Sequence, residues 1–256
     1  MKAIIIAAGM GKRLMPYTKD KPKCMLEIGG KPLIKHQADV LTSLGINDIH
    51  VIKGYEQKAF DSFRPSFNYY INENYRNNNI LESLFCAEPE ISGEVIILYS
   101  DIIFSRGVLA KLLETKEEIS IVVDVNWEEN YIGRLHHPIE EAENVVFDSK
   151  SYIRKIGKII DMDKSLVPGE FVGMMKLRGE GSSTLKKLYH ESRRKCQDGP
   201  FQKAASFSKA YITDMIQELV DNSVKVFCVK VQNGWKEIDT MEDLQNAEEI
   251  YKKLGL

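Results

Sequence analysis

The sequence has few of the features that mark several common protein classes. Its four cysteines, Cys24, Cys86, Cys196 and Cys228, are far apart and form no Cys-x-x-Cys pair. This spacing argues against structural zinc and indicates a reduced, cytoplasmic protein. No apolar run approaches the roughly 18 residues of a membrane helix, and the run Ala3–Ala8 is too short for the apolar core of a signal peptide. We therefore expect a cytoplasmic protein with no membrane partner.

An excess of charge of one sign is also lacking. The chain has 35 lysines and arginines against 37 aspartates and glutamates, for a formal net charge of −2. Nucleic-acid-binding domains typically carry a basic excess, so we expect no nucleic-acid partner. The length of 256 residues and the hydrophobic content of 43% suit a single domain over residues 1–256 with a sizeable core. Neither number decides whether the protein forms a homo-oligomer.

Two well-known phosphate-binding patterns are missing from the amino-terminal region. The dinucleotide fingerprint requires a third glycine at the position of Leu14. The P-loop requires a glycine at the position of Ile6 and a serine or threonine at that of Arg13. The first mismatch disfavours a nicotinamide-dependent oxidoreductase, which is one alternative for a chain of this kind.

Instead, the amino-terminal stretch contains a run of small residues followed by cations. The apolar residues Ala3–Ile6 predict a buried strand, which ends at Ala7, Ala8 and Gly9, with Gly11 two residues further on. Small residues let the backbone approach a ligand closely, and its N–H groups can then face phosphate oxygens. Three nearby cations would add charge of the opposite sign: Lys12, Arg13 and Lys23.

This stretch resembles the signature of the nucleotidyltransferases that activate sugar phosphates and other small phosphates. The signature is a strand, then small-small-Gly-x-Gly-x-Arg, then x-x-Pro-x-Thr, then Pro-Lys. Its elements appear in order at Ala7, Ala8, Gly9, Gly11, Arg13, Pro16, Thr18, Pro22 and Lys23. The resemblance implies an α/β fold with a Rossmann-like, mostly parallel mixed sheet flanked by helices. It also implies that Arg13 and Lys23 are catalytic and that the small residues and Lys12 bind the nucleotide.

The rest of the chain alternates between strand-like and helix-like patterns, which is typical of a parallel sheet with covered faces. The expected strands lie at 48–53, 68–71, 94–99, 119–125, 152–156, 158–160, 169–175 and 224–231. The expected helices lie at 31–45, 56–63, 80–85, 108–114, 182–195 and 208–220, with a last one after Thr240. The charged and aromatic stretch 126–170 is expected to be a small insertion that forms part of the acceptor pocket.

An asparagine-rich stretch, 72–79, precedes the helix that starts at Ile80. Its composition alone favours a surface loop with a helix cap. In the resembled enzymes this region contacts the nucleotide base, so the resemblance implies that Asn79 and Ser83 recognise the base. An amide or hydroxyl that pairs with the base edge is what such recognition requires.

Two aspartates are candidates for metal binding. Asp101 follows the apolar run 94–99, and Asp239 stands in the tetrad Glu-Ile-Asp-Thr before the last helix. An aspartate at such places is often a turn former or a helix cap, and that alternative stays open for both. Both fall where the resembled family carries its metal-binding aspartates, so the resemblance implies Mg²⁺ as the cofactor. Mg²⁺ takes few protein oxygens and keeps phosphates among its other ligands.

The residues of the acceptor site are harder to recognise. In the resembled enzymes a residue near Glu170 faces the acceptor, and Asp214 stands where many relatives have an aspartate that shapes the acceptor site. An exposed edge carboxylate is an equal alternative for Glu170. Arg134 with either His136 or His137 would suit a phosphate or phosphonate. Adjacent residues on a strand point to opposite faces, so we do not expect both histidines to bind one metal ion.

The whole chain is most similar to the compact cytidylyltransferases that use CTP. The segments 99–102 and 124–127 look similar to the phosphonate enzymes, which make CMP-linked 2-aminoethylphosphonate or hydroxymethylphosphonate, and the phosphocholine enzymes share the signature loop. The resemblance implies Mg²⁺-dependent transfer of CMP from CTP to a small phosphonate or to phosphocholine, with release of pyrophosphate. The alternatives are a sugar 1-phosphate nucleotidylyltransferase using UTP, dTTP or CTP, and a catalytically silent nucleotide-binding protein.

Overall fold

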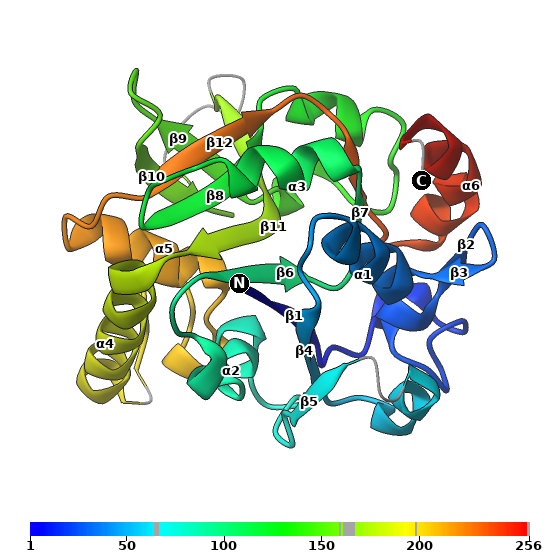
Figure 1. Ribbon diagram of the computed structural model, residues 1–256, viewed down its shortest axis with the longest axis horizontal. Coiled ribbons are helices and arrows are strands. Elements are labelled where there is room, and N and C mark those ends of the chain that lie inside the picture. Colours follow the sequence, from blue (N-terminus) through cyan, green and yellow to red (C-terminus); the bar gives the residue numbers. More distant parts are fainter. Residues whose placement is uncertain (64–66, 159, 161–166, 198, 255–256) are drawn as a thin grey trace.

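The computed structural model describes residues 1–63, 67–158, 160, 167–197 and 199–254. A nine-stranded sheet runs through this part of the chain (Figure 1). Its strands are β1 (Lys2–Ala7), β4 (Asp48–Lys53), β5 (Asn68–Ile71), β6 (Val95–Tyr99), β8 (Ile119–Asp124), β9 (Asn144–Phe147), β10 (Ile153–Gly157), β11 (Gly169–Leu177) and β12 (Phe227–Val231). The order is β5-β4-β1-β6-β11-β8-β12, and β9 and β10 extend the sheet beside the start of β11.

The strand directions confirm the expected mostly parallel mixed sheet. β1 pairs in parallel with β4 and β6, β4 with β5, and β8 with β12, whereas β11 runs antiparallel to its neighbours. Ala7 at the end of β1 is in register with Lys53, and Ile6 with Tyr99 at the end of β6. The carboxyl ends of these strands therefore meet at one edge, where ligands collect in open α/β sheets.

Helices cover both faces of the sheet. α1 (Leu33–Ser43) and α3 (Arg106–Leu113) lie on one face, and α2 (Ile80–Phe85), α4 (Gly179–Cys196) and α5 (Ile212–Asp221) lie on the other (Figure 1). The alternation of apolar side chains along β1 explains this arrangement. Ala3 and Ile5 pack with the first pair of helices, and Ile4 and Ile6 pack with the second group.

A smaller cluster packs α6 (Met241–Leu254) against the loop that follows β1. Leu14, Leu26, Ile238 and Ala247 are buried together there, beside the two-stranded pairs β2 (Glu27–Ile28) with β3 (Lys31–Pro32) and β7 (Ile102–Phe104) with β13 (Trp235–Glu237). In Figure 1 α6 lies at the right-hand side, next to these short strands. Asp239, between β13 and α6, is thereby brought to the carboxyl edge of the main sheet.

The expected insertion contains short helical turns as well as strands. The turns η5 (Trp127–Tyr131) and η6 (Ile139–Glu141) enclose a small apolar cluster of Trp127, Ala142 and Val167. β9 and β10 then join the main sheet through β11, and β9 was not expected from the sequence. Lys158 lies just beyond the end of β10, and residue 159, in the other predicted strand, lies outside the described residues.

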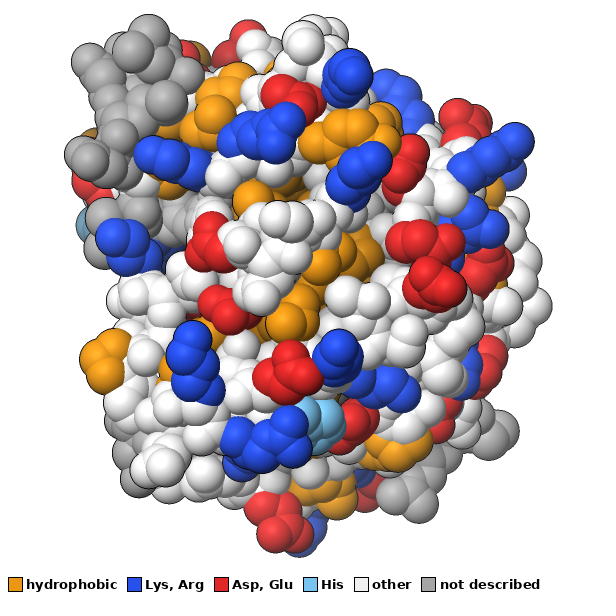
Figure 2. All heavy atoms as spheres, turned by 90° about the vertical axis from the view of Figure 1, so that its left-hand side faces the viewer, with side chains coloured by type: hydrophobic (Ala, Val, Ile, Leu, Met, Phe, Trp, Pro, Cys, Tyr) orange, Lys and Arg blue, Asp and Glu red, His pale blue; other side chains and the backbone are white. Residues whose placement is uncertain are grey.

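The helix predicted from Lys31 begins at Leu33, because Lys31 and Pro32 pair with β2. Figure 2 shows the side that carries α4 and α5, where lysines and arginines are interspersed with aspartates and glutamates. Among the described residues, no helix has both the length and the apolar character that a membrane crossing requires.

Candidate active site

The loop after β1 is held tightly against the segment that carries Lys23. Gly11 has a φ of +58°, and a Cβ added there would lie 3.0 Å from the Lys23 Cβ and 3.2 Å from the Thr18 Cγ2. The Thr18 hydroxyl also donates to the Gly11 carbonyl oxygen at 2.9 Å. A left-handed backbone with no room for a side chain requires glycine, so Gly11 determines how closely the loop approaches Lys23.

Lys23 joins the two candidate metal-binding aspartates. Its amine lies 2.8 Å from Asp101 Oδ2 and 2.5 Å from Asp239 Oδ1, and the whole residue is 8% exposed. Burial alone would lower the pKa of this amine, but Asp101 and Asp239 raise it above its usual value. Lys23 therefore stays protonated between two carboxylates that come from distant parts of the chain.

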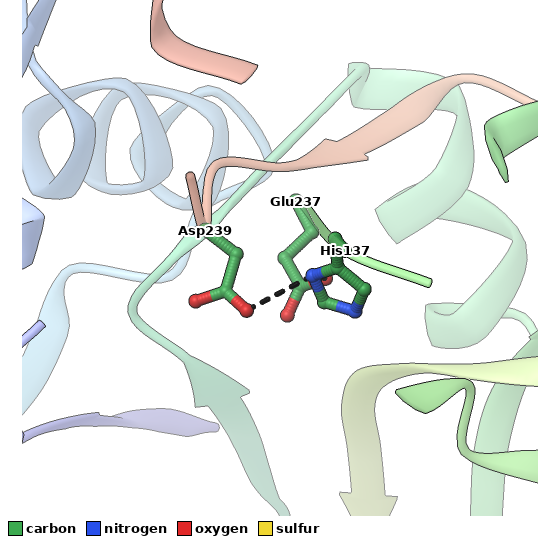
Figure 3. Close-up of side chains that lie close together, drawn as sticks. All are labelled: His137, Glu237 and Asp239. Atoms are coloured by element: carbon green, nitrogen blue, oxygen red, sulfur yellow. Dashed lines mark ion pairs between the residues drawn. The ribbon is translucent and has the colours of Figure 1, made fainter. Parts of the chain in front are cut away.

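Asp239 is the centre of the charged cluster. Besides Lys23, it pairs with Arg13, and its Oδ2 lies 3.0 Å from His137 Nδ1. Burial raises the pKa of the Asp239 carboxyl, but Lys23, His137 and Arg13 outweigh this effect and hold that pKa well below its usual range. Figure 3 shows His137, Glu237 and Asp239 lying close together, with the His137–Asp239 pair marked.

The side chains in this cluster fit a divalent cation. Asp101 Oδ1 is buried and has no hydrogen-bond partner within the described part of the chain, and ligand atoms of His137, Glu237 and Asp239 lie within 4.8 Å of one another. A set dominated by carboxylate oxygens suits Mg²⁺, a hard cation. Glu237 was not predicted as a site residue, and His137 was named only as one of two histidines that would suit a phosphate, not as a metal ligand. Glu237 stands in the tetrad that identified Asp239, whereas nothing in the sequence distinguished the buried His137 from the exposed His136.

A cavity of about 350 Å³ brings together all the residues predicted to bind the nucleotide. They line it together with both predicted catalytic residues and both aspartates: Ala7, Ala8, Gly9, Gly11, Lys12, Arg13, Lys23, Asn79, Ser83, Asp101 and Asp239. Tyr75 and Asn78 also line it and were not predicted.

Asn79 and Ser83 have structural partners as well as a place in the cavity wall. Asn79 caps α2 by accepting from the Ile80 N–H at 2.9 Å, which is the cap that the composition favoured. Ser83 accepts from the Asn72 side-chain amide at 2.8 Å. These bonds fix the position of both side chains, and their predicted role with the base stays a prediction.

A second cavity of about 220 Å³ adjoins the first, and the two share Arg13, Asn79, Asp101 and Asp239. Its wall is rich in aromatic rings and carboxylates, and also contains a lysine: Tyr99, Tyr131, Phe171, Tyr211, Trp235, Glu141, Glu143, Glu170, Glu237 and Lys158. Of this set, Glu170 was predicted as an acceptor-site residue.

Glu170 is buried in the wall of the second cavity, so the alternative of an exposed edge carboxylate is wrong. It is 5% exposed. Its Oε1 accepts from the Tyr131 hydroxyl, while its buried Oε2 has no hydrogen-bond partner among the residues that the structure describes. Sequence reasoning placed Glu170 near the acceptor, and the structure places it in a cavity that continues from the charged cluster.

The unusual ionisation of Glu170 leads to a prediction about stability. Burial raises its pKa from 4.5 to about 8, a shift that the Tyr131 hydrogen bond and Arg134 oppose and that Glu237 and Glu143 increase. Because the folded state holds this proton more tightly than the unfolded state, the associated stability is present below pH 4.5 and is lost as the pH rises toward 8. We expect Glu170→Gln to gain stability relative to the wild type over that interval, by a few kcal/mol.

Urea unfolding at a series of pH values measures this difference. Glu143 and Glu237, whose pKa values burial raises to about 7, are present in both proteins and titrate in the same interval. A constant difference between variant and wild type across the whole interval would contradict the prediction.

Arg134 does not line either cavity among the described residues, contrary to the expectation that it faces a phosphate. Its guanidinium donates to Asp243 Oδ2 at 2.8 Å, and the Leu135 N–H donates to Glu242 Oε2 at 2.9 Å. The same Asp243 oxygen accepts the backbone N–H of Asp239 at 3.0 Å. Arg134 therefore fastens the insertion to the start of α6, next to Asp239.

Asp214 lies in the first turn of α5 and also lies away from the second cavity. Its Oδ2 accepts from the Tyr211 N–H at 2.8 Å and its Oδ1 from the Lys203 N–H at 3.3 Å. Both oxygens are thus used to hold the backbone, which is a helix-capping role. The expectation that Asp214 shapes the acceptor site through its own side chain is not supported by this position.

Two substitutions at Asp214 separate capping from acceptor binding. We expect Asp214→Ala to lower the free energy of unfolding by about 1 kcal/mol, as the loss of a helix cap typically does. Asp214→Asn keeps an oxygen acceptor, so it should retain most of that stability and leave the KM for the acceptor unchanged. Denaturant unfolding and steady-state kinetics measure the two effects. A large rise in KM for Asp214→Asn would return this residue to the acceptor site.

Comparison with known proteins identifies the family of this chain. Residues 3–165 match the MobA-like NTP transferase domain family. The chain is 32% identical to the CTP:phosphoglutamine cytidylyltransferase of Campylobacter jejuni over 254 residues, which cover 96% of this chain and 98% of the relative. It is 37% identical to the choline-phosphate cytidylyltransferase of Streptococcus pneumoniae over 108 residues, 41% of this chain and 47% of that protein.

Solved structures share the fold. The CTP:phosphocholine cytidylyltransferase of S. pneumoniae superposes with a TM-score of 0.73 at 21% identity, covering 97% of this chain and 98% of that one. The inositol-1-phosphate CTP transferase of T. maritima gives 0.73 at 23% identity, with 99% and 94% covered. The family match and the relative that is similar over nearly the whole chain identify the protein as a nucleotidyltransferase. The chain belongs to the MobA-like NTP transferase family.

Proposed function

We propose that this protein is a cytidylyltransferase that transfers CMP from CTP to the phosphate or phosphonate group of a small, amine-bearing acceptor in an Mg²⁺-dependent reaction. The observation that carries the proposal is the bridge formed by Lys23 between Asp101 and Asp239, where the two cavities meet. CTP as the nucleotide is supported by the relatives, which are named for CTP with phosphoglutamine and for phosphocholine.

The transfer needs charge neutralisation more than proton transfer. An acceptor phosphate oxygen is already an anion, so it can form the new bond to the α-phosphorus without a general base. The bond from that phosphorus to the bridging oxygen breaks, and pyrophosphate leaves with the electron pair. The barrier comes from bringing two anions together, which positioned cations lower.

The cations of the site are placed for this task. The Lys23 amine lies at the junction of the cavities and would neutralise charge on the α-phosphate and on the acceptor. Arg13 lines both cavities and would hold the departing phosphates. Asp101 and Asp239, with Glu237 and His137 beside them, would hold Mg²⁺, and the bound ion would supply further positive charge to the site.

The second cavity favours an acceptor that carries an amine. Its acidic side chains include Glu170, whose buried Oε2 has no hydrogen-bond partner in the described ranges, and aromatic rings such as Tyr131 and Trp235 also line the wall. Carboxylates and ring faces both attract an ammonium group. Phosphocholine and 2-aminoethylphosphonate fit this description, whereas hydroxymethylphosphonate and a sugar 1-phosphate lack the positive group.

A pyrophosphate-release screen tests the proposal. CTP, UTP, dTTP and ATP are each combined with phosphocholine, 2-aminoethylphosphonate, hydroxymethylphosphonate and glucose 1-phosphate, with Mg²⁺ or with EDTA. We expect release with CTP and the amine-bearing acceptors, and loss of the signal in EDTA. A preference for UTP or dTTP with the sugar phosphate would overturn the acceptor and the nucleotide. Release with no combination would favour a silent nucleotide-binding protein.

A further inference from the structure

The second cavity contains a cation that an acceptor with only an amine does not require. The amine of Lys158 lies 2.9 Å from Glu141 Oε2 and 4.8 Å from the centre of the Tyr211 ring. All three side chains line the cavity, and the Lys158 side chain is 29% exposed. Burial lowers the pKa of this amine, but Glu141 and Tyr211 reverse the effect and raise it, so the group is charged at neutral pH.

Lys158 does not serve as the counter-ion of the deepest carboxylate. Its closest partner is Glu141, whose side chain is 41% exposed. Among the described residues, the buried Glu170 Oε2 has no hydrogen-bond partner, and Glu143 accepts from the hydroxyls of Tyr99 and Thr213, at 3.2 and 3.4 Å. The charge of Lys158 lowers the pKa of the buried Glu143, whereas its direct ion pair is with Glu141. A ligand can therefore meet the Lys158 amine and Glu170 in one cavity, and a bound ammonium group would lower the raised pKa of Glu170 and favour its carboxylate.

The strand register places these opposite charges near each other. Asn144 on β9 is in register with Gly157 on β10 and with Glu170 on β11. Lys158 directly follows Gly157. Lys158 and Glu170 therefore lie on opposite sides of β9, both close to Asn144. Two strand spacings separate their backbones by about 10 Å, and both side chains reach the same cavity of about 220 Å³. One small molecule can therefore contact both.

We infer that the acceptor is a phosphorylated or phosphonate α-amino acid, with its ammonium group on Glu170 and its carboxylate on Lys158. This inference rests on the proposed cytidylyltransferase function. The phosphate end of such a molecule points toward Arg13, which lines both cavities, and toward Lys23 in the adjoining nucleotide cavity. The Tyr131 hydroxyl donates to Glu170, and the Tyr211 ring lies next to the Lys158 amine, so both side chains are held in position.

Matched pairs of acceptors test the inference. O-phosphoserine differs from O-phosphoethanolamine, and 2-amino-3-phosphonopropionate from 2-aminoethylphosphonate, only by the α-carboxylate; phosphoglutamine extends the amino-acid set. With CTP, we expect kcat/KM to be at least about tenfold higher for the amino-acid member of a pair, since a charge-assisted contact to a partly buried cation is lost in the other. Lys158→Met should abolish this preference by raising the KM of the amino acid. The readout is the ratio of kcat/KM within each pair, so that an effect common to both acceptors cancels.

Two further variants make the result specific. Lys158→Arg keeps the positive charge and should keep most of the preference. Lys155→Met removes an exposed lysine from β10 that does not line the second cavity, and it should leave kcat/KM unchanged for both members of a pair. Calorimetric binding of O-phosphoserine and O-phosphoethanolamine should show the same pattern without turnover, including its loss in Lys158→Met.

The outcomes separate this inference from the proposed function. If no acceptor yields pyrophosphate with CTP, the proposed function fails, and the inference with it. If phosphoethanolamine, 2-aminoethylphosphonate or phosphocholine react as well as or better than every amino acid tested, and Lys158→Met changes nothing, the cytidylyltransferase stands and the amino-acid site is overturned.

Discussion

Replacing Lys23 by methionine is expected to lower the turnover of CTP by about 10²–10³-fold, as the loss of one positioned electrostatic contact to a transition state typically does. The Lys23 amine lies between Asp101 and Asp239, at 2.8 and 2.5 Å. Without it, the two carboxylates repel each other and the incoming phosphates. The rate of pyrophosphate release at saturating CTP and acceptor measures the loss, and circular dichroism checks that the variant is folded.

Two controls distinguish a role of this charge from a general effect of the substitution. Lys19→Met removes an exposed lysine from the same region and should leave the rate unchanged. Lys23→Arg keeps the charge but places a planar group where a compact ammonium fits, so it should recover only part of the rate. Near-normal turnover in Lys23→Met would remove this residue from the catalytic machinery.

Asp239→Asn is expected to cause an equally large loss of turnover, about 10³-fold, because the carboxylate both pairs with cations of the site and would bind Mg²⁺. Its partners are Lys23, Arg13 and His137. Turnover measured against Mg²⁺ concentration should show that saturation requires more Mg²⁺ than in the wild type. Asp101→Asn should shift the Mg²⁺ dependence in the same direction.

The same substitution has a pH signature that does not depend on activity. The folded-state pKa of Asp239 is depressed, so its ion pairs stabilise the fold above the usual carboxyl pKa of 3.8, and this stabilisation is lost as the pH falls below it. The difference in unfolding free energy between wild type and Asp239→Asn should therefore shrink on acidification. Asp20→Asn, at an exposed position, should show no such trend. In the turnover experiment, an Mg²⁺ dependence of Asp239→Asn equal to that of the wild type would argue against Asp239 as a metal ligand.

The sequence was most informative where local pattern and sheet geometry agree. The apolar run before Ala7 and the one before Asp101 predict buried parallel strands, and their carboxyl ends must meet at one edge. This reasoning is enough to predict that the loop after β1 lies near Asp101. Asp239 was predicted from the family signature, since its approach depends on how α6 packs on the loop after β1.

The second cavity was far less predictable, for two physical reasons. Glu143, Lys158 and His137 come from a stretch of short strands and turns without a clear hydrophobic period. The pairing of these strands with each other and with β11 could therefore not be derived from the sequence. Arg134 and Asp214 were predicted as site residues because of their charge. In the structure Arg134 bonds to Asp243 on α6, and Asp214 caps the start of α5. Such partners become visible only when the backbone is placed.

The attachment of the insertion to α6 has a consequence for the engineering of new acceptor specificities. Asp243 receives both Arg134 from the insertion and the backbone N–H of Asp239. A segment 126–143 transplanted from a relative would lose its anchor unless residues 239–243 travelled with it, and a poorly matched graft would displace Asp239 together with the acceptor wall. The two stretches, about a hundred positions apart in the chain, are best exchanged as one module.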